Sequence, residues 1–109
     1  MTDCIFCKIA AGTIPVKAVY EDEACMAFAD ANPMAPTHLL VIPRQHFVDV
    51  ETAPTELLGQ LLNAASTVGQ RELPGGHRIV INTGSDGGQT VHHLHLHLLG
   101  GRPMHWPPG

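Results

Sequence analysis

Residues 93–99 alternate strictly between two residue types and read His-Leu-His-Leu-His-Leu-Leu. Side chains along a β-strand point to opposite faces in turn, so this pattern predicts a strand with three imidazoles on one face and leucines on the other. A polar, solvent-facing strand would explain one such histidine. Three histidines in register favour a functional site on this strand.

The rest of the chain divides into apolar segments that glycine and proline separate. We expect strands over residues 16–20, 24–29, 37–42, 78–82 and 89–99, and helices over residues 4–11 and from 54 to about 72. Asp3 is expected to cap the first helix, Gly12 to end it, and Pro54 to lie in the first turn of the second. Five strands with only two helices predict an α+β fold with a five-stranded antiparallel sheet. With 109 residues, the chain is expected to form a single domain over 1–109.

Charge and composition limit the possible partners. Six Lys plus Arg against ten Asp plus Glu give a net charge of -4, which argues against nucleic acid or an anionic membrane as the partner. A small anionic ligand remains possible. The sequence has no run of eighteen apolar residues, and its first residues lack a basic region followed by an apolar stretch, so we expect neither a membrane-spanning nor an exported protein. Its three cysteines are an odd number and suit a reducing compartment, so we expect the cytoplasm.

A glycine-rich segment, residues 83–88, precedes the histidine-rich strand. Its three glycines permit positive φ and close backbone approach. The amides around Gly88, Gln89 and Thr90 are therefore expected to face a concavity that holds an oxyanion. Asn82 and the Thr90 hydroxyl would add neutral donors. The segment alone is equally explained as a flexible turn, but beside the histidines it suggests phosphate chemistry.

Two kinds of histidine chemistry fit the pattern. A metal ion could be held by His93, His95 and His97, because catalytic zinc sites often use three histidines. Same-face residues of a straight strand span about 13 Å over three positions, so one ion would require strongly converging rotamers. Alternatively, one imidazole is a nucleophile and its neighbour assists proton transfer, which requires no metal.

The alternating motif resembles the signature of the histidine triad (HIT) superfamily of nucleotide hydrolases and transferases. The resemblance extends over nearly the whole chain and includes residues 5–9, 14–15, 35–38, 41–43 and 84–89. The tail over residues 100–109 is similar to that of the Hint branch, the purine nucleoside phosphoramidases. The resemblance implies that His95 attacks the α-phosphorus of a purine nucleoside 5′-phosphoramidate or an aminoacyl-adenylate. Water would then release the nucleoside monophosphate from a nucleotidyl-histidine intermediate.

The resemblance also assigns the other site residues. His97 would contact the phosphate and the leaving group, His38 would be a fourth active-site histidine, and His93 completes the triad. The phosphate would be bound by Asn82, Gly88, Gln89 and Thr90, the ribose by Asp30, and the base by Phe6, Ile14 and Phe28. Catalysis would need no cofactor. The family's homodimers join their sheets edge to edge, and Trp106 would reach the active site of the partner.

The C-x-x-C pair resembles the thiolates of a structural zinc site in many bacterial HIT proteins. The resemblance implies a ligand set of Cys4, Cys7, His46 and His93. Such a set would form a closed tetrahedral site and would join the N-terminal helix to the sheet without supplying catalysis. Two buried cysteines on one helix face are the alternative explanation. Two other functions also remain open, namely a zinc-dependent hydrolase that uses the three histidines and a non-enzymatic nucleotide-binding adaptor.

Overall fold

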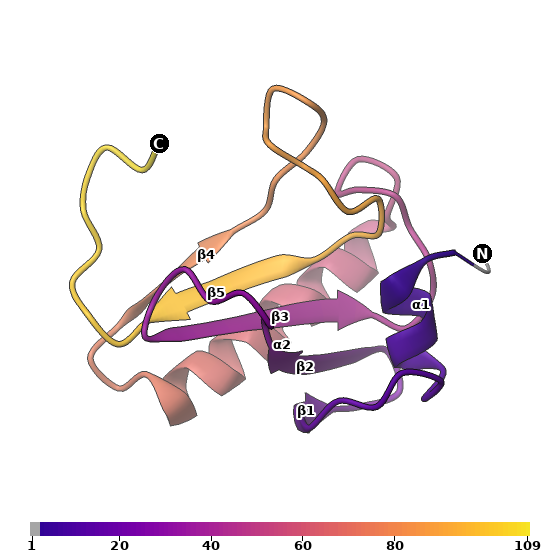
Figure 1. Cartoon of the computed structure of the whole chain (residues 1–109), viewed down its shortest axis with the longest axis horizontal. Helices are drawn as coiled ribbons and strands as arrows, with labels where there is room; N and C mark the ends of the chain where they lie inside the picture. Colours follow the sequence, from indigo (N-terminus) through magenta and orange to yellow (C-terminus); the bar gives the residue numbers. More distant parts are fainter. Residues whose placement is uncertain (1–2) are drawn as a thin grey trace.

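The computed structural model describes residues 3–109 and shows five strands and two helices (Figure 1). The elements in chain order are α1 (Ile5–Ala10), β1 (Ala18–Glu21), β2 (Cys25–Ala29), β3 (Thr37–Pro43), α2 (Thr55–Glu72), β4 (His77–Val80) and β5 (Leu96–Gly100). The expected α+β class and the five-stranded sheet are confirmed.

The strands form one sheet in the order β1-β2-β3-β5-β4, and all neighbouring strands are antiparallel. β1 and β2 form a hairpin. β5 lies between β3 and β4, with Leu40 opposite His97 and His38 opposite Leu99. The last triad histidine is therefore held in the middle of the sheet, where backbone hydrogen bonds on both sides fix its position.

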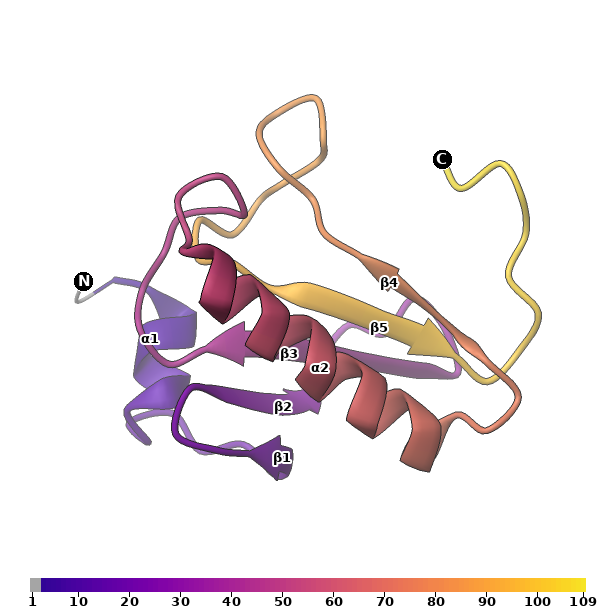
Figure 2. The ribbon, with the colours of Figure 1, turned by 180° about the vertical axis from the view of Figure 1, so that it is seen from behind.

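Helix α2 covers one face of the sheet (Figure 2). Its apolar stripe, which includes Leu61 and Val68, packs on Leu94, Leu96 and Leu98, and all five side chains are buried. Each buried leucine contributes roughly 2 kcal/mol of hydrophobic stabilisation. The leucines of the alternating motif thus form the core that the sequence predicts.

The short helix α1 packs on the opposite face of the sheet (Figure 1). Phe6 and Ile9 contact a second apolar cluster that includes Phe28, Leu40 and Ile42. Leu40 and His97 are cross-strand partners, so their side chains share this face. The histidines of the motif therefore lie on the face that α2 leaves uncovered.

The helix ends differ from the expectation. α1 begins at Ile5, and its N-cap is Cys4 instead of Asp3, because the Cys4 Sγ accepts a hydrogen bond from the backbone N–H of Cys7. Gly12 follows the helix with a φ of 81°, as expected. α2 begins at Thr55, one residue after Pro54, which is the N-cap residue.

The expected strand over residues 89–99 is wrong in its first half, because β5 begins only at Leu96. The Leu94 N–H donates to the carbonyl of Phe47 in a loop, so the chain before Leu96 is held outside the sheet ladder. β4 likewise ends at Val80 instead of residue 82. The side-chain alternation nevertheless continues through residues 93–95. Among the described residues, no helix has the length and apolar character to cross a membrane.

Candidate active site and metal site

A cavity of about 450 Å³ lies between α1, the end of β2, the middle of β3 and the segment from residue 82 to 97. One part of its wall is apolar and the other carries polar groups. The cavity is lined by Ile5, Phe6, Ile9, Ile14, Val16, Phe28, Ala29, Asp30, Ala31, Leu40, Asn82, Gly88, Thr90, Val91, His95 and His97. Nine of the predicted nucleotide-site and catalytic residues are among them. An apolar cavity with a few convergent polar groups is typical of a small-molecule site.

His95 is held in one tautomer by the backbone. Its Nδ1 lies 2.7 Å from the carbonyl oxygen of His93, and its side chain is buried. A carbonyl oxygen only accepts, so the Nδ1 of His95 carries the proton and Nε2 carries the lone pair. His95 lines the cavity and thus presents an unprotonated imidazole nitrogen for nucleophilic chemistry.

His97 is held in the opposite tautomer. The Met34 N–H donates to the Nδ1 of His38 over 3.0 Å, so the proton of neutral His38 is on Nε2. That Nε2 lies 2.8 Å from the Nδ1 of His97 and 3.4 Å from a carboxylate oxygen of Asp30. The Nδ1 of His97 therefore accepts, and its Nε2 carries the proton. The ring centroids of His95 and His97 are 5.0 Å apart, so a ring with a lone pair on Nε2 neighbours a ring with an N–H donor.

The protein keeps His97 neutral. Burial lowers the pKa of His97 to about 4, and the charges of protonated His95 and His38 act in the same direction, while Asp30 opposes them. Its ordinary pKa is 6.5. At neutral pH the His97 side chain thus donates a hydrogen bond without carrying a positive charge.

This shift predicts a pH-dependent contribution of His97 to stability. As pH falls below 6.5, the unfolded chain binds a proton at this position first, so the free energy of unfolding falls until the pH reaches about 4. At about 1.4 kcal/mol per pKa unit the upper bound is about 3.5 kcal/mol, and solvent screening at this half-buried side chain lowers the contribution below that bound. Urea denaturation at pH 7 and pH 4.5 should show a smaller loss of stability for His97→Gln than for wild type. An equal loss in both proteins would contradict this assignment.

The ring of His93 points away from the cavity. Its Nε2 donates to the carbonyl oxygen of Pro43 over 3.0 Å, which leaves the lone pair on Nδ1. That Nδ1 lies 3.3 Å from the Sγ of Cys4, 3.5 Å from the Sγ of Cys7 and 3.1 Å from the Nδ1 of His46. His93 therefore lies on the predicted face of the motif, but its ring belongs to the Cys/His cluster and not to the cavity that His95 and His97 line.

The residues of this cluster fit a zinc ion. The Sγ of Cys7 lies 3.3 Å from the Nδ1 of His46, and the four ligand atoms all lie within 4.8 Å of one another. Tetrahedral zinc with ordinary ligand distances places its ligand atoms roughly 3.3–3.8 Å apart. Burial lowers the pKa of His93 and so favours the neutral, metal-binding imidazole. The donor set and the free lone pair on His93 both suit a closed structural site.

A second group of possible ligands, formed by Asp30, His38 and His97, is less suited to a metal ion. Its ligand atoms also lie within 4.8 Å of one another. However, the Met34 N–H donates a hydrogen bond to the Nδ1 of His38. The Nε2 of His38, which is the atom near Asp30 and His97, therefore carries a proton instead of a lone pair. Asp30, His38 and His97 therefore form a hydrogen-bonded chain.

Phe6 lies between the two histidine environments. Its ring makes edge contacts with His93 and His95, at centroid distances of 5.8 Å and 5.2 Å, and with Phe28 at 6.0 Å. Because Phe6 also lines the cavity, the same ring separates the Cys/His cluster from the nucleotide-sized cavity.

The glycine-rich loop differs in part from the expectation. Gly84 and Gly88 have positive φ, whereas Gly87 does not. The N–H groups of Gly88 and Gln89 donate to carbonyl oxygens inside the loop, so they do not face the cavity as expected. The Gln89 side chain is buried and bonds the loop backbone and the carbonyl of Val48, so it holds the loop in place and does not line the cavity.

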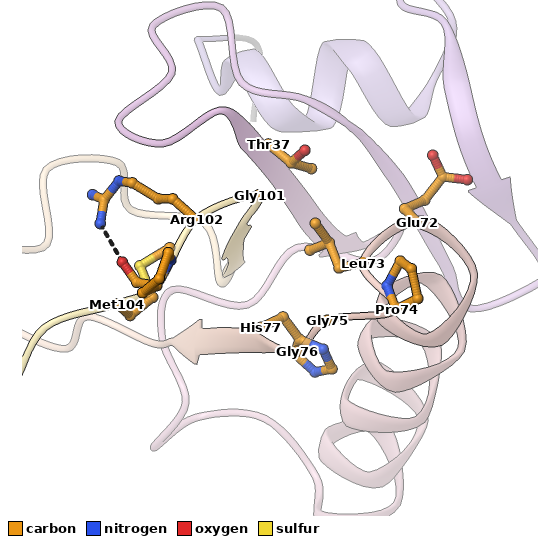
Figure 3. Close-up of a pocket in the computed structure, with 11 residues that line it drawn as sticks. Thr37, Glu72, Leu73, Pro74, Gly75, Gly76, His77, Gly101, Arg102 and Met104 are labelled. Atoms are coloured by element: carbon orange, nitrogen blue, oxygen red, sulfur yellow. Dashed lines mark hydrogen bonds between the residues drawn. The ribbon is translucent and has the colours of Figure 1, made fainter.

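Trp106 lies outside the cavity of this chain and is 81% exposed. The tail that carries it is fixed by Arg78, which donates to the carbonyl oxygen of His105. A larger cavity of about 650 Å³ lies where β3 begins and β5 ends, next to residues 101–104 (Figure 3). It contains none of the predicted site residues, and its Arg102 points to the Pro103 carbonyl. We therefore place the candidate active site in the smaller, histidine-lined cavity.

Sequence reasoning missed the backbone groups that set the tautomers, namely the Met34 N–H and the carbonyl of Pro43. Every residue has a carbonyl group and every residue except proline an N–H, so no sequence signal could have identified these two. It also missed Ile5, Val16 and Leu40 as cavity walls. Their apolar character is equally typical of core positions.

Comparisons with known proteins agree with this geometry. A family model described as HIT domain matches residues 11–104. A 14 kDa zinc-binding protein of Zea mays is 50% identical over 96% of this chain and 87% of its own length. A HIT family hydrolase from Legionella pneumophila is 49% identical, with a TM-score of 0.93 over 98% of this chain and 100% of the other. A histidine triad nucleotide-binding protein from Candida albicans is 29% identical, with a TM-score of 0.84 over 96% of this chain and 83% of the other.

Proposed function

The chain belongs to the HIT domain family, and from this premise we propose that it is a Hint-type hydrolase of purine nucleoside 5′-phosphoramidates or aminoacyl-adenylates. The observation that carries the proposal is the pair of opposed tautomers at the cavity, a lone pair on His95 beside an N–H on His97. A nucleophile next to a neutral donor is what the cleavage of a P–N bond requires.

In the proposed reaction, the Nε2 of His95 attacks the α-phosphorus and displaces the amine. The Nε2–H of His97 gives its proton to the departing nitrogen, which leaves as a neutral amine, and His97 takes a proton back from the attacking water in the next step. His38 holds His97 in the tautomer that can do so. Water then attacks the phosphorus of the nucleotidyl-imidazole, which releases the nucleoside monophosphate and regenerates His95. Positioning and charge stabilisation supply most of the catalysis of phosphoryl transfer.

We assign residues of the cavity to the base, the ribose and the phosphate of a nucleotide. Phe6, Ile14 and Phe28 would contact the base, and Asp30 would accept from the ribose hydroxyls. One carboxylate oxygen of Asp30 already accepts from the N–H of Asn32, which fixes the side chain at the cavity. The phosphate would lie beside the side chains of Asn82 and Thr90. Gln89 would act indirectly, by holding the loop.

The proposed zinc site has a structural role. Cys4, Cys7, His46 and His93 would bind the ion, which would supply a fixed link between α1 and the sheet. None of these side chains lines the cavity, so no step of the proposed reaction passes through the ion. A homodimer in which Trp106 of one chain approaches the cavity of the other is also part of the proposal.

The geometry favours this proposal over a zinc hydrolase with three histidine ligands. The Nδ1 of His93 points at the cysteines, while the Nδ1 of His95 donates to a backbone carbonyl. The three rings therefore do not converge on one point. A nucleotide-binding adaptor remains an alternative that only turnover can separate from an enzyme.

The test is steady-state hydrolysis of a fluorogenic adenosine 5′-phosphoramidate, with AMP release followed in parallel. We expect continuous turnover that produces one AMP for each amine released. Tight AMP binding without any turnover of phosphoramidates or aminoacyl-adenylates would instead identify an adaptor.

A further inference from the structure

Two thiols, Cys4 and Cys7, lie together at the start of α1. Both side chains are partly exposed, and their sulfur atoms lie within 4.8 Å of each other. They contact His93 and His46 through sulfur-nitrogen distances of 3.3–3.5 Å. The third thiol, Cys25, is fully buried in β2 and lies outside this group. Cys4 and Cys7 are therefore a pair of neighbouring thiols that a soluble oxidant can reach.

Helix α1 depends on this pair for its position. With six residues it is too short to be stable alone. Phe6 and Ile9 pack on the sheet, and the contacts of Cys4 and Cys7 with the two histidines provide its polar attachment. A change at the thiols therefore removes one of the two kinds of contact that hold α1.

The same elements connect the thiol pair to the cavity. α1 supplies Ile5, Phe6 and Ile9 to the cavity wall. His93 contacts both thiols through its ring, and its carbonyl oxygen accepts the hydrogen bond that orients His95. The Phe6 ring also contacts His93 and His95. Displacement of α1 or of His93 would therefore change both the wall of the cavity and the orientation of its nucleophile.

We infer that Cys4 and Cys7 form a redox-sensitive site at which a hydroperoxide, by joining the two thiols, loosens α1 and weakens nucleotide binding. In the first step one thiolate attacks the peroxide, its O–O bond breaks, and a sulfenic acid and hydroxide form. The other thiol then attacks that sulfur, the S–S bond forms, and water leaves. The two sulfurs lose two electrons and the peroxide gains them. The disulfide cannot serve as two thiolate ligands, so a bound zinc ion is released unchanged in charge.

The test begins with zinc-loaded protein treated with hydrogen peroxide. Peptide mass mapping after alkylation is expected to show a Cys4–Cys7 disulfide and a free Cys25, because burial raises the pKa of the Cys25 thiol to about 11. A chromogenic chelator should detect released zinc, and amide hydrogen exchange over residues 5–10 should become faster. The dissociation constant of AMP is expected to rise on the order of tenfold, the range for loss of a supporting contact around a site. Treatment with dithiothreitol and zinc should restore the free thiols, the zinc content, the slow exchange of α1 and the AMP affinity.

The matched control is the double variant Cys4→Asp, Cys7→Asp, which keeps ligand types that zinc accepts but has no thiol pair. Peroxide should leave its zinc content and the exchange of α1 unchanged. The inference is overturned if wild type forms the disulfide without faster exchange of α1, or if both thiols stay alkylatable after peroxide treatment. The effect on AMP rests on the proposed function, whereas the disulfide, the zinc release and the exchange of α1 do not. A protein that shows these three responses but neither binds AMP nor hydrolyses phosphoramidates would refute the proposed function alone.

Discussion

The variant His95→Ala is expected to lose phosphoramidate hydrolysis by about 10⁴-fold or more, because the nucleophile of a covalent mechanism has no substitute in the cavity. The neighbouring His97 has its Nδ1 committed to His38 and carries its proton on Nε2, so it offers no lone pair to the phosphorus. Steady-state kinetics with a fluorogenic adenosine 5′-phosphoramidate measure the loss. AMP affinity should change far less, since the walls of the cavity remain.

The control for this prediction is His92→Ala. His92 is exposed, lies three residues before His95 and does not line the cavity. Its replacement removes an imidazole from the same segment and should leave kcat/KM near the wild-type value. Thermal denaturation of both variants would establish that they fold. A folded His95→Ala variant with more than a tenth of wild-type activity would refute the role of His95 as nucleophile.

The second large effect is expected at the Cys/His cluster. Cys7→Ser should reduce the zinc content from about one ion per chain to none, because it removes one of four ligands from a closed site. Part of the free energy of zinc binding is folding free energy, so unfolding should become easier by at least about 3 kcal/mol. For a chain of this size the Tm should fall by more than about 10 °C. Elemental analysis of protein purified without chelator, together with calorimetry, would measure both changes.

Cys25→Ala is the matched variant for the cluster. It also removes a thiol, but from a fully buried position in β2 outside the ligand group. It should lower stability by the amount typical of a small core change and keep its zinc. A wild-type protein without zinc, whose stability is also insensitive to chelator, would support the alternative of two ordinary cysteines on one helix face.

The alternating motif of residues 93–99 predicts which side chains enter the core and which face the cavity. Leu94, Leu96 and Leu98 form the predicted core under α2, and His95 and His97 share the opposite face with the cavity. The side chains of residues 93–95 still alternate between the two faces although these residues form no strand. A locally extended backbone alternates its side chains even without a hydrogen-bonded neighbouring strand. The apolar residues of α2 recur at helical spacing, so the face of this helix that packs on the sheet is predictable as well.

The separation of His93 from the other triad histidines was not predictable from spacing alone. Its ring direction depends on the Pro43 carbonyl, fifty residues away in the sequence, and on α1. The role of Gln89 was not predictable from spacing either. Its buried side-chain amide donates to the carbonyl oxygen of Val48, which is distant in the sequence. Such contacts arise from tertiary packing of backbone groups, which residue identity does not encode. The resemblance to the HIT superfamily named His46 and the two cysteines as a ligand set, and the structure brings these side chains together with His93.

Trapping of the intermediate tests the central claim most directly. Wild-type protein would be mixed with a slowly cleaved adenosine 5′-phosphoramidate, quenched in base within the first turnover, and digested for peptide mass spectrometry. Our account predicts AMP joined to His95 and to no other histidine, with none in His95→Ala. A burst of free AMP without a protein-bound nucleotide, or AMP joined to His93 or His97, would contradict it.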